Sequence, residues 1–222
     1  RALMAASATL VSLAFALSTL ERWLARRRRH EAAWTISLFL FAAGSASLWL
    51  GAAVGWGEWS FKAFYLFGAI LNVPFLALGT VELLAGPNHG RRWMAIVATL
   101  CAFCTGLVVS APIIGPIDHD VLPQGRDVFE AGPRIAAAVA SGVAATVILV
   151  GALWSSWRLF RGRKRPGAPT TVPAGRLALA NLFIAGGTLV LSAGGVLNSV
   201  VDEMDGFAIS LVVGISIIFA GF

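Results

Sequence analysis

One predicted helix face carries the residue types best suited to bind a ligand inside a membrane. Tyr65, Gly68, Asn72, Gly79 and Glu82 follow one another at spacings of three, four, seven and three residues. Residues at such spacings share one face of an α-helix. A phenol, an amide and a carboxyl group on that face could line a polar cavity, and ionisable groups within a membrane are hypotheses for function. The alternative is inter-helix packing, with Asn72 hydrogen-bonded to a neighbouring helix and Glu82 near the end of the span.

A second predicted helix, residues 177–201, carries Asn181 and Asn198. We therefore keep open a ligand pocket between the predicted helices 32–54, 61–85 and 177–201, opening outward. Its candidate residues are Tyr65, Asn72, Glu82, Asn181 and Asn198.

Small residues recur at every fourth position in several runs, which lets helices approach closely. Examples are Gly44, Ser47, Gly51 and Gly55 in one run, and Ala138, Gly142 and Thr146 in another. We interpret these faces as packing seams.

The elements that must position these residues are membrane spans. The chain has 222 residues, of which 58% are hydrophobic and 13% charged, and its mean hydropathy is +0.80. Soluble domains are about half apolar and about a quarter charged, so an ordinary soluble enzyme, a disordered chain and a disulfide scaffold are excluded. A helix needs about 20 apolar residues to cross the bilayer. We predict an all-α polytopic bundle of seven transmembrane helices, forming a single domain. The expected spans are residues 2–20, 32–54, 61–85, 93–114, 133–160, 177–201 and 207–222.

The charges between these runs predict the orientation. Thirteen of the seventeen basic residues fall in the links after the first, third and fifth runs, and four fall on the other side. Basic residues mark the cytoplasmic side, so we expect the N-terminus outside and the C-terminus inside a bacterial plasma membrane. The chain begins at Arg1 and stops inside an apolar stretch at Phe222, and we expect both ends to be trimmed.

Two charged loop segments suggest binding to ions or lipids. Asp118, His119 and Asp120 offer ligands that a hard divalent cation prefers, but no loop has EF-hand spacing, so they are only weak metal candidates. Arg26, Arg27, Arg28 and Arg29 could bind anionic lipid, but a topology signal is the stronger interpretation.

Other chemistry-bearing patterns are missing, and we expect no cofactor. His30, His89 and His119 all lie in predicted loops, so no histidine is placed to bind haem within the membrane. No lysine lies in the middle of the last run, which argues against a retinal Schiff base. The sequence has no P-loop, no G-x-S-x-G and no H-E-x-x-H motif. Cys101 and Cys104 lie one turn apart in an apolar run, where small core residues are the better interpretation.

The stretch from Trp34 to Glu82, with Trp49, Pro74 and Gly79 among its residues, resembles two helices of the seven-helix sensor region that precedes bacterial histidine kinases. This likeness covers about a quarter of the chain, and no signalling domain follows. The whole chain also resembles uncharacterised seven-helix integral membrane proteins of high-GC Gram-positive bacteria. Neither resemblance implies a catalytic or binding residue.

Two functions follow as expectations. The first is a non-enzymatic membrane protein that serves as an accessory, partner-binding subunit of a larger plasma-membrane assembly. Its partners would be the lipid bilayer and other membrane subunits, and no nucleic acid. The second is a small-molecule sensor or carrier that uses the polar pocket.

Overall fold

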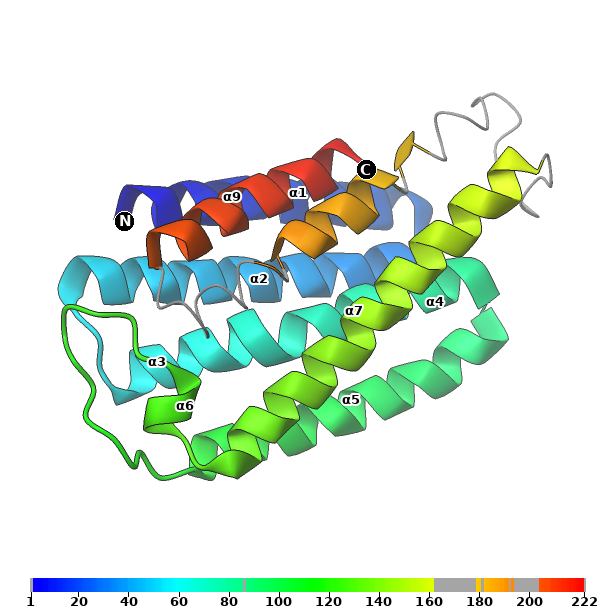
Figure 1. The fold of residues 1–222 in the computed structure, drawn as a ribbon. Coiled ribbons are helices and arrows are strands. Elements are labelled where there is room, and N and C mark those ends of the chain that lie inside the picture. Colours follow the sequence, from blue (N-terminus) through cyan, green and yellow to red (C-terminus); the bar gives the residue numbers. More distant parts are fainter. Residues whose placement is uncertain are drawn as a thin grey trace.

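In the computed structural model, the described residues are 2–85, 87–161, 179–180, 182–191, 193 and 204–221. Within them the chain is helical, with no strand (Figure 1). The elements in chain order are α1 (Ala2–Arg26), α2 (Arg29–Val54), α3 (Glu58–Phe64), η1 (Tyr65–Leu71), α4 (Asn72–Ala85), α5 (Pro87–Ser110), α6 (Gly125–Val128), α7 (Ala131–Phe160) and α9 (Met204–Ala220).

Five helical stretches in the described part are long and apolar enough to cross a membrane. They are Ala2–Arg26, Arg29–Val54, Glu58–Ala85, Gly90–Ser110 and Ala131–Arg158. The chain is therefore built as a multi-pass membrane protein, and the five stretches coincide with the first five expected spans. In the regions of the last two expected spans, the described residues form the shorter apolar helices Leu182–Leu191 and Ile209–Ala220. Seven crossings remain a prediction.

Local chemistry explains where two of the helices end. α5 ends at Ser110, four residues before the expected end, because Pro112 has no N–H to donate and disfavours helical backbone at Ala111. α1 and α2 are joined by only two residues. The Arg27 N–H donates to the Trp23 carbonyl at 2.7 Å, and Arg27 turns the chain with a φ of 51°.

The third expected span is a helix of three segments: α3, the π-helical η1, and α4. Pro74 lies just after η1 and cannot donate a hydrogen bond to the carbonyl of Ile70, one turn earlier. A wider turn lets other donors reach the freed carbonyls, and single π-helical turns occur frequently at functional sites.

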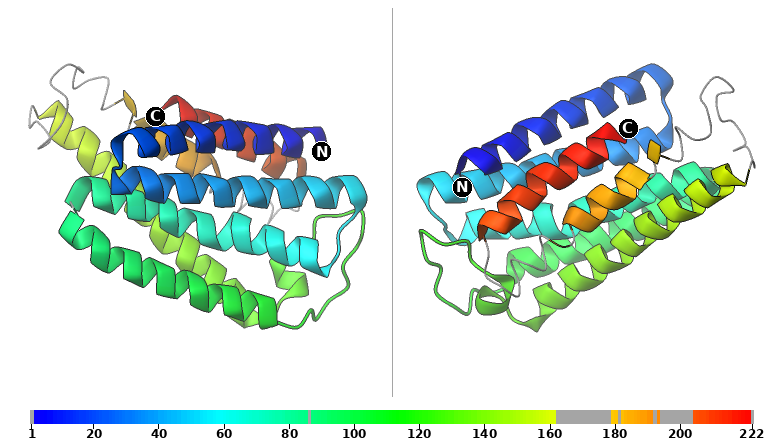
Figure 2. Two further views of the ribbon diagram at one scale, coloured as in Figure 1. Left: turned by 180° about the vertical axis from the view of Figure 1, so that it is seen from behind. Right: turned by 45° about the horizontal axis from the view of Figure 1, so that its top comes forward.

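α2 lies between α1 on one side and the α3–η1–α4 helix on the other (Figures 1 and 2). α4 also contacts α5 and α7, and α9 packs against α1. α2 and η1 approach closely because two glycines face each other. A Cβ on Gly44 would lie 2.7 Å from the backbone of Gly68. This pair confirms the predicted close packing of a small-residue face of α2 against a neighbouring helix.

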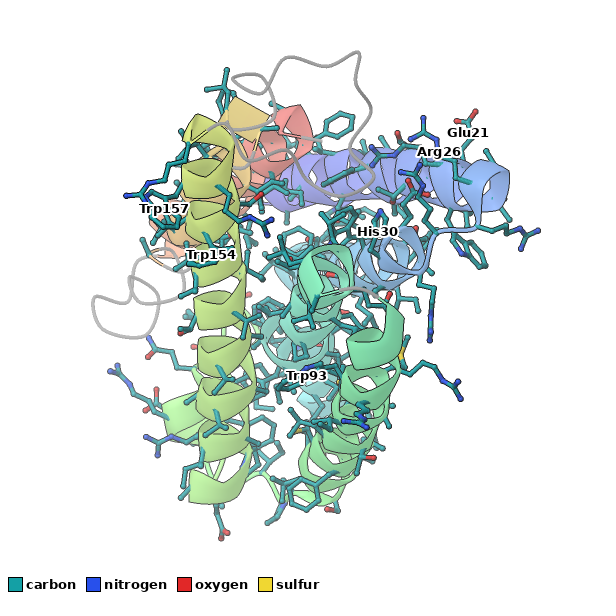
Figure 3. The ribbon with its side chains drawn as sticks, turned by 90° about the vertical axis from the view of Figure 1, so that its right-hand side faces the viewer. Glu21, Arg26, His30, Trp93, Trp154 and Trp157 are labelled. Atoms are coloured by element: carbon teal, nitrogen blue, oxygen red, sulfur yellow. The ribbon has the colours of Figure 1, made fainter. Side chains whose placement is uncertain are left out.

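The two ends of the bundle differ in composition. The α1–α2 turn, the start of α5 and the end of α7 lie at one end, which we call the arginine end (Figure 1). Figure 3 views the molecule from this end, with Arg26 and His30 beside the α1–α2 turn and Trp93, Trp154 and Trp157 on α5 and α7. The opposite end, which we call the cap end, holds residues 111–130 and α6.

Candidate functional site

Aromatic rings fasten the cap end to the helix that carries the expected ligand face. Phe129 stacks on Phe61 with ring centroids 5.4 Å apart and meets the edge of Tyr65 at 5.1 Å. The backbone N–H of Trp56 donates to the backbone carbonyl of His119 at 3.0 Å. Gly125 of α6 lies so close to Tyr65 that a Cβ there would be 2.7 Å from Cε2 of the tyrosine. The cap therefore fixes the position of the Tyr65 ring.

A lysine fastens the same region to α5. Lys62 is 5% exposed, and its Nζ lies 2.7 Å from Oε1 of Glu58 and 3.2 Å from the Val109 carbonyl oxygen. A cation at the C-terminal turn of a helix interacts favourably with the helix dipole. Lys62 therefore has a structural task at the cap end, which the sequence pattern did not predict.

Behind Tyr65 lies a cavity of about 610 Å³. Residues of α2, η1, α4, α7, Leu182–Leu191 and α9 line it, and most of the lining is apolar. In the described part of the chain the polar side chains of its wall are those of Ser37, Ser45, Tyr65, Asn72, Arg134, Ser141 and Thr188. A few polar groups in an apolar wall of this size are typical of a small-molecule site.

Asn72 is the most informative of these polar residues. It is 5% exposed and lines the cavity, and its Oδ1 has no hydrogen-bond partner among the described residues. Its backbone carbonyl is occupied, because the Ser37 hydroxyl donates to it at 2.7 Å. Ser141 of α7 donates to the carbonyl of Ala69. Hydroxyl groups on both sides thus hold the backbone of this wall in place, and the Asn72 Oδ1 itself is buried within the wall.

Arg134, an exposed residue of the lining, brings a positive charge to the cavity near the cap end. It lies in the first turn of α7 and interacts electrostatically with Tyr65. The described lining contains no Asp or Glu, and no ion pair joins Arg134 to any described residue. Sequence reasoning missed this residue as a site candidate. The only signal was an arginine in the first turn of an alanine-rich helix, where the helix dipole disfavours a cation.

Of the five expected pocket residues, the structure places two in the cavity wall and one away from it, and the other two lie outside the described residues. Tyr65 and Asn72 line the cavity. Glu82 is not among the lining residues. Its buried carboxylate lies towards the arginine end, with Oε1 3.7 Å from Nε of Arg29. Asn181 and Asn198 lie outside the described residues.

α7 forms a wall that the expected pocket did not include. Ala138 and Gly142, interpreted from the sequence as part of a packing seam, line the cavity instead. A Cβ added to Gly142 would meet nothing within 4 Å among the described residues. α7 makes its tight contact through other residues, since Ala144 and Ile148 pack with Ala77.

The two charged loop segments are both exposed. Asp118, His119 and Asp120 lie at the cap end, where the Asp118 carboxylate accepts a hydrogen bond from the backbone N–H of Asp120 at 2.9 Å. Among the described residues, no group of three His, Cys, Asp or Glu side chains could hold a metal ion.

The arginine run lies at the opposite end of the bundle, with Arg26, Arg27, Arg28 and Arg29 all exposed. Arg27 lies over the Trp23 ring at 5.4 Å, and Arg29 pairs with Glu82.

Comparison with protein-family models, with curated proteins and with solved structures returned no match. The site is therefore interpreted from its own geometry and chemistry.

Proposed function

We propose that this chain binds a small molecule inside its helical bundle, as a membrane sensor or carrier. The cavity behind Tyr65 supports this, because its volume of about 610 Å³ lies within the usual range for small-molecule sites. Its wall combines apolar side chains, which bind by exclusion of water, with a few polar groups that can orient a ligand. No chemical step is part of the proposal.

The observation that carries the proposal is the unpartnered amide oxygen of Asn72. Buried polar atoms are nearly always hydrogen-bonded, and leaving one without a partner costs about 1–3 kcal/mol. A ligand with a hydroxyl or N–H group would satisfy this oxygen once the Asn72 side chain turns it from the wall into the cavity. Asn72 also directly follows the π-helical turn η1, an irregularity often found at binding sites.

Filling the cavity tests the proposal. Gly142 lines the cavity and is itself exposed, and a Cβ there meets nothing within 4 Å among the described residues, so Gly142→Leu adds a side chain at the cavity wall without a clash. We expect the purified protein to lose any small molecule that native mass spectrometry detects on the wild-type chain. Gly106→Leu is the matched control, because Gly106 lies on an exposed face of α5 and a Cβ there also meets nothing within 4 Å among the described residues.

Two results would contradict the proposal. One is a wild-type protein that carries no bound molecule. The other is a bound molecule that both variants retain to the same extent.

An accessory subunit of a larger membrane assembly is the second candidate function. One observation favours it: only 22% of the α5 span is buried within the chain, against 39–44% for the first three spans. This leaves a wide face of α5 to be covered by lipid or by another subunit. A second protein chain that co-purifies in stoichiometric amount would support this function, and a monomer free of other chains would argue against it.

A further inference from the structure

We infer that the ligand is an anionic amphiphile, with an acidic group near Arg134, an apolar body, and a hydrogen-bond donor that reaches Asn72. This inference rests on the proposed function, since it names the class of molecule that the same cavity holds. Three features of the cavity wall carry it: a cation near the cap end, an apolar middle, and an unpartnered acceptor far from the cation.

Arg134 is the group that selects for negative charge. It is the only charged side chain in the described lining. It lies where the first backbone N–H groups of α7 add partial positive charge. A guanidinium binds a carboxylate or phosphate through two parallel hydrogen bonds. An acidic headgroup therefore fits this end of the cavity better than a neutral or cationic one.

The middle of the cavity suits an apolar chain. Its wall includes Phe41 of α2 and Ile215 of α9, and the bare backbone of Gly142 leaves room on α7. Burial of a chain in such a space contributes about 0.8 kcal/mol for each CH₂ group. Most of the affinity therefore comes from this part of the ligand, and the polar ends determine which ligand binds.

Asn72 lies deep in the cavity relative to Arg134. The hydrogen bond from Ser141 to the Ala69 carbonyl places these two residues at the same level of α7 and η1. α4 and α7 run in the same direction (Figure 1), so Asn72 lies near the level of Ala145. At 1.5 Å per residue, the levels of Arg134 and Asn72 are about 15 Å apart. An extended chain with polar groups at both ends spans such a distance.

The acidic group could come from a free single-chain acid or from the headgroup of an anionic phospholipid. The chemistry that Arg134 recognises is the same in both, so the test must separate them.

A competition assay tests the inference. The full chain is placed in phosphatidylcholine nanodiscs with radiolabelled dodecanoate. Unlabelled dodecanol, dodecyltrimethylammonium and ω-hydroxydodecanoate then compete for binding. We expect dodecanol and the ammonium compound to bind at least about tenfold more weakly than dodecanoate, because they lose the charged hydrogen bonds. We expect ω-hydroxydodecanoate to bind about fivefold more tightly, because its hydroxyl group reaches Asn72.

Single substitutions then test which residue causes each of these binding preferences. Arg134→Gln should remove the preference for dodecanoate over dodecanol. Arg126→Gln should keep it, because Arg126 pairs with Asp127 at the cap end and does not line the cavity. Asn72→Leu should remove the advantage of the ω-hydroxyl group and leave dodecanoate binding in place.

The outcomes separate this inference from the proposed function. Equal binding of dodecanol and dodecanoate, with both blocked by Gly142→Leu, overturns the anionic ligand and leaves the cavity as a binding site. If no probe binds in a way that Gly142→Leu blocks, both conclusions are overturned. With phosphatidylglycerol in the nanodisc, displacement of dodecanoate that depends on Arg134 supports a phospholipid as the source of the anion. Retention of dodecanoate supports a free acid.

Discussion

At the residue scale, the contact between Arg29 and Glu82 is asymmetric. The Glu82 side chain is 2% exposed, and neither of its oxygens has a hydrogen-bond partner among the described residues. The Arg29 side chain is 45% exposed, so surrounding polar groups can solvate it without its partner. A buried charge that loses its counter-ion is far more costly than an exposed one. The two residues of one ion pair should therefore respond differently to substitution.

We expect Arg29→Gln to lower the free energy of unfolding by about 1–3 kcal/mol, because it leaves a buried carboxylate without a cation. Glu82→Gln should lower it by less than about 1 kcal/mol, the usual range for an exposed partner. Thermal unfolding of the purified protein in detergent measures both. Arg28→Gln is the control, since Arg28 is exposed beside the same turn. Equal losses from Arg29→Gln and Glu82→Gln would refute the asymmetry.

The spacing of residues in the sequence predicted part of the cavity wall. The helical period correctly grouped Tyr65, Gly68 and Asn72, which all line the cavity. Gly79 and Glu82 lie further along the helix and contact α2 instead of the cavity: Gly79 packs against the Trp34 ring, and Glu82 reaches Arg29. Asn72, Gly79 and Glu82 all lie in α4, after the π-helical turn, so that turn does not separate them. The lining residues of α4 end at Leu76, and from Gly79 onward α4 is packed against Trp34 and Arg29 of α2. The helical period predicts which residues share a face, but it cannot predict where along that face a cavity ends.

At the element scale, the same kind of residue has two opposite uses. Gly44 lets α2 and η1 touch, whereas Gly142 leaves open space on α7. A small residue at every fourth position permits both a tight seam and a cavity wall, so the sequence could not distinguish them. Hydropathy predicted the five long helices because every backbone group in lipid must be paired within its own helix. It could not predict that α7 lines the site, since that depends on which helix faces which.

Alanine at the two glycines should separate these uses. We expect Gly44→Ala to lower the free energy of unfolding by about 1–3 kcal/mol, because its Cβ would lie 2.7 Å from the Gly68 backbone, which has no flexible side chain to move. Gly142→Ala should raise it by about 0.5–1 kcal/mol through helix propensity. Unfolding midpoints in detergent report both signs. A loss at Gly142 comparable to that at Gly44 would show that α7 is packed there.

At the scale of the whole molecule, the two ends of the helical bundle carry different kinds of residue. The arginine end holds the exposed run from Arg26 to Arg29, and the cap end holds the aromatic cluster and the acidic loop around Asp118. Arg134 gives the cavity its positive charge on the side of the cap. If the arginine end faces the cytoplasm, as the distribution of basic residues predicts, a ligand bound in the cavity has its acidic group towards the exterior. The orientation in the membrane therefore decides which side of the membrane the acidic group of the ligand faces.

Cysteine labelling in intact cells tests this orientation. We expect Asp118→Cys to react with a membrane-impermeant maleimide from outside, and Arg28→Cys to react only after the membrane is permeabilised. Both positions are exposed, and the two native cysteines, Cys101 and Cys104, are buried, so the background should be low. The unsubstituted chain measures that background. Labelling of Arg28→Cys in intact cells would reverse the orientation and place the acidic group of the ligand on the cytoplasmic side, because Arg134 and Arg28 lie at opposite ends of the helical bundle.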